Sequence, residues 1–248
     1  MKCDLKGLKA LVTGSSRGIG SAIAKELAQG GAEIFLHYAG NKASAEKMKA
    51  EIESIGGKAT IVQADLSDNT SYEKLADEVG DVDILVLNAS MQFRNKWENI
   101  TTEEFYKQIN CNLLSSLVLI QKFAPKMKEK HFGRIISIGS VQEAKPHPDM
   151  LVYSASKSAQ TTMIKSLALQ LAEYGITVNN VAPGVIYTDR NVDALSDPEY
   201  AKQVTDSIPL KFYGAKEDCS YIVRLLCSED GRYITGQSIF VDGGKSIM

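Results

Sequence analysis

The chain has 248 residues and a formal net charge of −2 at pH 7, with 44% hydrophobic and 23% charged residues, a composition ordinary for a soluble globular protein. It contains no basic block or basic-aromatic stripe, which gives no indication of binding to nucleic acid or to an anionic membrane surface. The N-terminal segment reaches Gly14 before any long apolar run, and the longest apolar stretch (113–120) is too short to span a bilayer. We therefore expect a cytoplasmic protein.

Cysteine and histidine positions argue against a metal site. Cys3, Cys111, Cys219 and Cys227 form no Cys-x-x-Cys pair and have no nearby histidine, and the three histidines of the chain are scattered. Structural zinc needs clustered ligands. We expect no bound metal, and free thiols in a reducing compartment.

Apolar runs alternate with amphipathic segments from the first strand to the last. The runs that read as strands are 9–14, 33–38, 59–65, 82–90, 133–140, 176–184 and 236–244. The segments that read as helices are 21–31, 43–57, 70–80, 103–130, 153–174 and 217–228, with Pro125 expected to kink the long one or to mark its last turn. Residues 185–213 read as polar and irregular.

Alternation of this kind predicts an α/β fold. About seven strands joined by helical crossovers form a doubly wound parallel sheet of Rossmann type, with helices on both faces. The near-continuous apolar strands fit a sheet that is covered on both sides. Length alone allows one domain or two. Because no linker or repeat interrupts the pattern, we expect a single domain over 1–248, with a long segment (about 187–214) that covers the substrate.

A glycine-rich turn, TGSSRGIG (13–20), lies between the first strand and the first helix. Gly14 permits a tight turn, Gly18 lets backbone approach a phosphate, and Gly20 lets the helix pack on the strand. The following helix directs free N–H groups and a positive dipole end at a pyrophosphate. A purely structural turn is the alternative. The pattern predicts a dinucleotide site whose contacts in this turn are Gly14, Ser16, Arg17, Gly18, Ile19 and Gly20.

Charges near the second strand bear on which dinucleotide binds. NAD sites usually carry an acidic residue about 20 residues after the turn, where it accepts from the ribose 2′-hydroxyl. No Asp or Glu lies between Ile34 and Ala45, whereas Arg17 sits in the turn itself. A cation in place of a carboxylate suits a 2′-phosphate. We predict NADP(H), with Arg17 and one or more of His37, Asn41 and Lys42 near that phosphate; the alternative is that Arg17 is only a solvated loop residue.

With these residues in place, the chain resembles the short-chain dehydrogenase/reductase family, and in particular its branch of 3-oxoacyl-carrier-protein reductases and glucose 1-dehydrogenases. The resemblance extends from Leu5 to Gly244. It rests on TGSSRGIG, QADLSD, NAS, NCNLLSS, GRIISIGS, YSASK, ITVNNVAPG and YITGQSIFVDGG. One departure is Ser90 in NAS, where the family usually has glycine, and its Cβ could shift the cofactor.

The resemblance implies residue roles. It implies a catalytic tetrad of Asn112, Ser140, Tyr153 and Lys157. It also implies cofactor contacts from Asp65 and Leu66 to the adenine, Asn88 and Ala89 to its ribose, and Tyr153, Lys157, Pro183, Gly184, Val185, Ile186 and Thr188 to the nicotinamide end. Family members are commonly homotetramers, so a tetramer built from the long helices and the C-terminal strand is expected.

The residues themselves suit carbonyl reduction. Hydride transfer builds negative charge on the carbonyl oxygen, where the site must deliver a proton. An unperturbed phenol has a pKa of about 10, and a nearby ammonium favours the phenolate. Lys157 follows Tyr153 by one helical turn, and Ser140 ends the preceding strand, where doubly wound sheets place their sites. We expect Ser140 to bond the substrate oxygen and Asn112 to hold a water beside Lys157.

The substrate is less defined. Residues 141–152 and 187–214 are expected to shape the pocket, with Ser140, Gln142, His147 and Tyr153 as substrate contacts. A sugar or polyol, or a 3-oxoacyl compound or small ketone, are the open alternatives. A different class is also possible, namely a protein that binds dinucleotide as a sensor without turnover.

Overall fold

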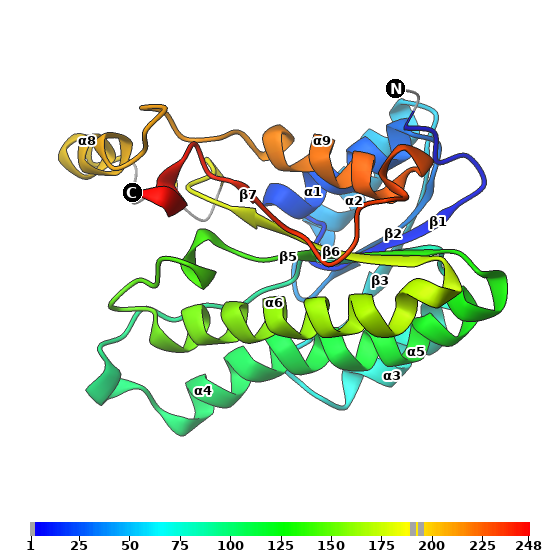
Figure 1. Cartoon of the computed structure of the whole chain (residues 1–248), viewed down its shortest axis with the longest axis horizontal. Coiled ribbons are helices and arrows are strands. Elements are labelled where there is room, and N and C mark those ends of the chain that lie inside the picture. Colours follow the sequence, from blue (N-terminus) through cyan, green and yellow to red (C-terminus); the bar gives the residue numbers. More distant parts are fainter. Residues whose placement is uncertain (1–2, 189–191, 193–195) are drawn as a thin grey trace.

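The computed structural model describes residues 3–188, 192 and 196–248. Seven parallel strands form one sheet in the order β3-β2-β1-β4-β5-β6-β7 (Figure 1). The strands are β1 Lys9–Val12, β2 Glu33–Tyr38, β3 Lys58–Gln63, β4 Ile84–Leu87, β5 Gly133–Ile138, β6 Ile176–Pro183 and β7 Ser238–Val241. The predicted doubly wound α/β sheet is confirmed. Its strand order reverses between β1 and β4, which is where such sheets bind ligands.

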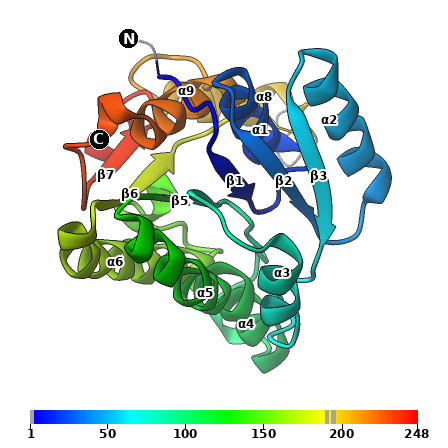
Figure 2. The same ribbon diagram turned by 90° about the vertical axis from the view of Figure 1, so that its right-hand side faces the viewer.

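Helices cover both faces of this sheet, as Figures 1 and 2 show. One layer holds α3 Ser71–Val79, α4 Thr102–Ile109, α5 Ser115–Lys130 and α6 Leu151–Leu171, and the other holds α1 Gly18–Gln29, α2 Lys42–Ser54 and α9 Lys216–Cys227. Each layer buries its own apolar core against the strands. Because both faces are covered, β4 and β6 are buried along their whole length.

The predicted long helix over 103–130 is interrupted. It consists of α4 and α5, joined by a π-helical turn at Asn110–Leu114. Pro125 lies inside α5, which continues past it to Lys130, so the proline does not mark the last turn. π-helical turns inside helices occur frequently at functional sites. This one carries Asn112.

The segment 185–213 is not irregular throughout, so that prediction was wrong. It contains α8, Pro198–Asp206, which starts at an Asp197 side chain that accepts from the backbone N–H groups of Glu199 and Tyr200. Its two ends are held together, because Ile186 pairs with Gly214. Residues 189–191 and 193–195 of the predicted covering segment lie outside the described residues.

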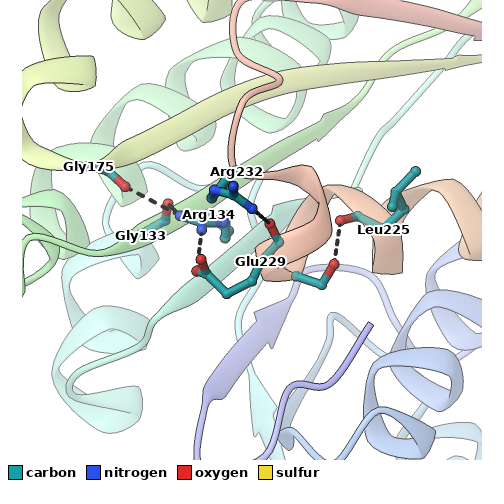
Figure 3. A network of polar contacts seen from close by, with 7 residues as sticks. Gly133, Arg134, Gly175, Leu225, Glu229 and Arg232 are labelled. Carbon is teal, nitrogen blue, oxygen red and sulfur yellow. Dashed lines mark hydrogen bonds and ion pairs between the residues drawn. The ribbon is translucent and has the colours of Figure 1, made fainter. Parts of the chain in front are cut away.

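A buried guanidinium stabilises the end of the sheet at which the parallel strands begin (Figure 3). Arg134, near the start of β5, donates to the carbonyl oxygens of Gly133 (2.9 Å) and Gly175 (3.3 Å) and pairs with Glu229 at 3.0 Å. The Arg134 side chain is 3% exposed and the Glu229 side chain 69% exposed. Burial lowers the pKa of Arg134, and the Glu229 carboxylate opposes this.

Within the described residues, no helix is long and apolar enough to cross a membrane.

Candidate active site

A large cavity of about 840 Å³ lies at the carboxyl ends of the strands. It spans the switch point between β1 and β4 and extends to the start of α6. Of the predicted site residues, those that line it are Gly14, Ser16, Arg17, Gly18, Ile19, Gly20, His37, Asn41, Asp65, Leu66, Asn88, Ala89, Ser140, Gln142, His147, Tyr153, Pro183, Gly184, Val185, Ile186 and Thr188. Lys42, Asn112 and Lys157 do not line it; Lys42 is exposed, whereas Asn112 and Lys157 are buried, at 0% and 1% exposure.

The glycine turn has the backbone that a phosphate cradle needs. Gly14 and Gly18 adopt left-handed φ angles of +63° and +60°, which side chains rarely tolerate. A methyl group on Gly20 would overlap the Asn88 side chain and the Gly14 carbonyl oxygen, so α1 packs close to the turn only because this position is glycine. The first turn of α1 has no acidic residue and no side-chain cap, so nothing in it offsets the positive end of the helix dipole. These residues fit a pyrophosphate.

Asn88 braces this turn from β4. Its amide nitrogen donates to the carbonyl oxygens of Thr13 (2.8 Å) and Gly14 (3.0 Å). The Thr13 hydroxyl in turn accepts from the backbone N–H groups of Asn88 (2.9 Å) and Ala89 (3.0 Å). Thr13 was not predicted as a site residue, yet these bonds join the ends of β1 and β4 on either side of the switch point.

His37 has a structural contact that the sequence did not suggest. It lies at 2% exposure near the end of β2, where its Nδ1 accepts from the Gly14 N–H at 2.9 Å. Because Nδ1 accepts, Nε2 carries the proton and donates to the Ala64 carbonyl at 2.9 Å. Burial lowers the pKa of His37 to about 4. The ring is therefore neutral at pH 7, and both its nitrogens are already bonded.

The end of the cavity near α1 and α2 is poor in negative charge. Arg17 is exposed, immediately precedes α1 and lines the cavity. Asn41 caps α2 by accepting from the Ser44 N–H at 3.0 Å, and it lines the same region. Asp65 is the only carboxylate among the described lining residues, and it accepts from the Ser67 N–H and hydroxyl.

Ser140 lies just past β5 in an extended conformation. Its oxygen accepts from the Gln142 N–H at 3.1 Å, which leaves the hydroxyl hydrogen available for a bond into the cavity. Gln142 is held by Ser154, whose hydroxyl donates to its Oε1 at 2.8 Å. The segment after Ser140 is thereby fixed against the first turn of α6.

The Glu143 carboxylate also holds the segment after Ser140 in place. Glu143 accepts from the Thr161 hydroxyl at 2.7 Å and from the Asn180 amide at 2.9 Å. The Ser238 hydroxyl donates to its other oxygen at 2.5 Å. These three partners lie on α6, β6 and β7. Charge-assisted bonds of this kind are stronger than neutral ones, so they hold Ser140 in a fixed place relative to α6.

Tyr153 and Lys157 lie one turn apart on α6. Tyr153 is 7% exposed and lines the cavity, and the Lys157 Nζ lies 5.8 Å from the centroid of its ring. The Lys157 ammonium donates to the Ile138 carbonyl at 2.7 Å and to the Gln160 Oε1 at 3.1 Å. A buried ammonium needs such acceptors to stay charged. The arrangement places a cation directly behind a phenol that faces the cavity.

Gln160, which was not predicted as a site residue, links Lys157 to the first turn of α5, which follows the π-helical turn. Its Nε2 donates to the Ser116 hydroxyl at 2.9 Å, which fixes its amide oxygen toward Lys157. The Asn112 amide donates to the Met91 carbonyl at 2.9 Å and to the Ser156 hydroxyl at 3.0 Å, and its oxygen accepts from the Met91 N–H. The Asn112 side chain thus joins α6 to the loop after β4, and both of its amide hydrogens are committed.

The cavity is also lined by cations that the sequence analysis missed. Arg94 Nη2 lies 3.2 Å from the His147 Nε2, and Lys145 and Lys245 line the same cavity. Burial and the Arg94 charge lower the pKa of His147. Lys245 donates to the Ser207 hydroxyl at 2.6 Å, next to α8, whose Tyr200 also lines the cavity.

The nicotinamide side predicted from the family is built by the end of β6. Gly184 donates to the Val241 carbonyl at 2.9 Å, and a methyl group on it would come within 2.6 Å of the Asp242 Cα. Only glycine lets β6 and the segment after β7 approach so closely.

Within the described residues, no group of three or more His, Cys, Asp or Glu side chains could hold a metal ion.

Comparisons with known proteins place the chain in a family. The family model described as enoyl-(acyl carrier protein) reductase matches residues 14–246. The 3-oxoacyl-[acyl-carrier-protein] reductase of Staphylococcus aureus (strain Mu50) is 40% identical over 239 residues, which are 95% of this chain and 96% of that protein.

Two solved structures share the fold. A 3-oxoacyl (acyl-carrier-protein) reductase from Agrobacterium tumefaciens with NADP bound has a TM-score of 0.93 at 35% identity, covering 97% of this chain and 95% of that one. A gluconate 5-dehydrogenase from Burkholderia cenocepacia, in complex with NADP and tartrate, has a TM-score of 0.92 at 29% identity, covering 100% and 98%. The chain therefore belongs to the short-chain dehydrogenase/reductase family of oxidoreductases.

Proposed function

We propose that the protein interconverts a carbonyl compound and a secondary alcohol with NADP(H), using Tyr153 as proton donor and acceptor. The observation that carries this proposal is that Ser140 and Tyr153 line the same cavity, with the buried Lys157 ammonium 5.8 Å from the centroid of the tyrosine ring. The glycine turn at the other end of the same cavity fits a dinucleotide.

The residues divide the work of carbonyl reduction. When bound, NADPH supplies the hydride. The Ser140 hydroxyl, whose oxygen already accepts from Gln142, donates to the substrate oxygen and orients it. Tyr153 delivers its phenolic proton to that oxygen as negative charge develops, and the Lys157 ammonium stabilises the phenolate that remains.

Reprotonation of Tyr153 needs a route to solvent. We propose that the π-helical turn around Asn112 supports this route. The Asn112 side chain bonds to Met91 and Ser156, and these bonds fix the turn beside α6. Because both Asn112 amide hydrogens are committed, a water beside Lys157 would bind to a backbone carbonyl oxygen in this turn instead. The Asn112 carbonyl, which accepts from Ser116 at 3.4 Å, retains a second lone pair for that purpose.

The preference for NADP(H) over NAD(H) follows from charge. The residues after β2 that line the cavity, Ala39, Gly40 and Asn41, include no carboxylate, and Arg17 lines it from the glycine turn. Both solved relatives described above contain NADP. Replacing Arg17 with Ala is expected to raise KM for NADPH about ten-fold or more, as for loss of one charge-assisted bond, and to change KM for NADH little. An unchanged ratio of the two KM values would contradict this role.

The substrate is proposed at the level of a class. The relatives described above are named as a 3-oxoacyl-[acyl-carrier-protein] reductase and a gluconate 5-dehydrogenase. The candidates for this chain are accordingly a sugar or polyol derivative and a 3-oxoacyl compound or small ketone, contacted by Ser140, Gln142, His147 and Tyr153. A panel of 3-oxoacyl thioesters, keto sugars, polyols and simple ketones, followed at the nicotinamide absorbance with both cofactors, tests the proposal. A complete lack of turnover would overturn it.

A dinucleotide sensor without turnover is the second candidate. It is favoured only if NADPH binds, as measured by its fluorescence, while every substrate in the panel fails. The intact set of Asn112, Ser140, Tyr153 and Lys157 argues for the enzyme.

We also propose a homotetramer. Apolar side chains are exposed on the outer helices, among them Phe105 and Tyr106 on α4 and Leu169 on α6, at 41%, 58% and 85% exposure. Burying such side chains between copies is favourable. Light scattering after gel filtration measures the mass, and a monomer would contradict the proposal.

A further inference from the structure

Three cationic side chains, Arg94, Lys145 and Lys245, line the cavity, and His147 lines it beside Arg94. Among the described lining residues the one carboxylate is Asp65, which comes from the opposite side of the switch point, after β3. The whole chain carries a net charge of −2, so this local excess of cations does not reflect a basic protein. We call Arg94, Lys145 and Lys245 the basic cluster.

Arg94 and Lys245 contact no carboxylate in their hydrogen bonds, because the Arg94 guanidinium lies 3.2 Å from the His147 ring and Lys245 donates to the Ser207 hydroxyl. Lys145 donates to an oxygen of Met248, the last residue of the sequence, at 3.1 Å. None of the side-chain ion pairs formed among the described residues includes Arg94 or Lys245. Cations that face a cavity without a carboxylate partner favour an anionic ligand.

The charged form of Lys245 is disfavoured within the basic cluster. Lys245 is partly buried, and burial together with repulsion from Lys145 lowers its pKa, while Asp242 acts in the opposite direction. The Asp242 carboxylate is itself occupied by the backbone N–H groups of Gly244 and Ser246. An anion bound beside Lys245 would relieve the repulsion between the two lysines.

The position of the cluster separates it from the cofactor phosphates. Lys145 and His147 lie in the segment between Ser140 and Tyr153, and Lys245 contacts the residue after α8. The pyrophosphate cradle is formed instead by the turn between β1 and α1. The cluster therefore faces the substrate rather than the dinucleotide.

We infer that the substrate is an anionic carbonyl or hydroxy compound, whose carboxylate or phosphate group is bound by Arg94 and Lys245 while its carbonyl lies at Ser140 and Tyr153. This inference rests on the proposed function and narrows its substrate class. An Arg94 guanidinium that leaves the His147 ring can bind either anion through two parallel N–H donors. Lys145 adds charge at the rim of the same site.

Matched substrate pairs test the inference. Acetoacetate and methyl acetoacetate differ in charge but share the ketone, and dihydroxyacetone phosphate and dihydroxyacetone provide the phosphate arm. The wild-type protein is expected to prefer one charged member by about ten-fold or more in kcat/KM, the value of one charge-assisted bond. Preference in the first pair identifies a carboxylate, and preference in the second a phosphate ester.

Variants locate the anion site. In Arg94→Gln and Lys245→Gln the charged-to-neutral ratio of kcat/KM is expected to fall about ten-fold, whereas Lys96→Gln, an exposed lysine two residues after Arg94, should keep the wild-type ratio. Ratios near one in the wild type, or equal ratios in all variants, would overturn the inference while leaving the oxidoreductase proposal intact.

A binding measurement separates failure of the two proposals. Malonate has no ketone, so its calorimetric titration into the NADPH-bound protein reports on the anion site without turnover. Malonate binding that is lost in Arg94→Gln, together with no turnover of any ketone, would sustain the anion site and overturn the proposed function. No malonate binding and no preference for charged substrates would overturn the anion site.

Discussion

Acidification is predicted to weaken the protein through His37. In the folded state the neutral ring accepts from the Gly14 N–H and donates to the Ala64 carbonyl, and burial lowers its pKa from 6.5 to about 4, against the opposing effects of Ala64 and Asp65. A second ring proton would sit on Nδ1 and face the Gly14 N–H. Protonation therefore breaks the bond that holds the glycine turn.

The sign and size of the effect follow from linkage. Between pH 6.5 and about 4 the unfolded chain binds more protons at His37 than the folded chain, so stability rises with pH in this window. The contribution is fully present above pH 6.5 and is lost as the pH falls toward 4. The difference between the two pKa values corresponds to about 3 kcal/mol, since one pKa unit is worth about 1.36 kcal/mol.

Urea unfolding at pH 7.5 and 4.5 measures this contribution. An asparagine in place of His37 can still accept from Gly14 but does not titrate. Between the two pH values, the wild type is expected to lose about 2.5 kcal/mol more unfolding free energy than His37→Asn. The control His131→Asn removes an exposed histidine at a left-handed position that asparagine tolerates, and it should follow the wild type. Equal pH dependence of the wild type and His37→Asn would refute the reasoning.

Two further predictions concern buried charges. Gln160→Leu removes an acceptor from the Lys157 ammonium, a bond worth about 1.5–3 kcal/mol, so kcat is expected to fall about ten- to a hundred-fold and its pH profile to change. The control Gln170→Leu replaces an exposed glutamine on the same helix and should change neither kcat nor its pH profile. An unaltered pH profile in Gln160→Leu would contradict the positioning role of Gln160. Glu229→Gln removes the only charged partner of the Arg134 guanidinium among the described residues. Because that carboxylate is largely exposed and the carbonyl oxygens of Gly133 and Gly175 still accept from Arg134, the unfolding free energy measured by urea titration should fall by only about 1 kcal/mol. A loss above about 3 kcal/mol would contradict this and show that the pair behaves as fully buried.

The sequence predicted the sheet because its strands carry a clear signal. The apolar runs of β4, β5 and β6 are buried on both faces, and such runs are easily located even when their ends are uncertain by two or three residues. α8 was missed because it is short, has no buried residue and carries only three apolar side chains, Tyr200, Ala201 and Val204, in an otherwise polar segment. Its capping signals were present, with Asp197 before Pro198 and Glu199 in the first turn.

The candidate site was predicted where chemistry restricts the residue type. The glycines of the first turn were recognised by their place between a strand and a helix, and the Tyr153–Lys157 pair by the resemblance to the family together with Ser140. The roles of His37 and Gln160 could not, because each depends on contacts between distant segments, such as the bond from His37 to Gly14 and that from Gln160 to Ser116. Arg94 was missed for the same reason, since only the fold brings it to His147.

The central claim is that Tyr153 supplies the proton for carbonyl reduction in a dinucleotide site. Its most direct test is kcat for NADPH oxidation by Tyr153→Phe, measured with a ketone that the wild type reduces and beside an NADPH titration followed by fluorescence. The account predicts a kcat about 10²- to 10⁴-fold below the wild type, with NADPH binding retained. A Tyr153→Phe protein that turns over at nearly the wild-type rate would contradict it.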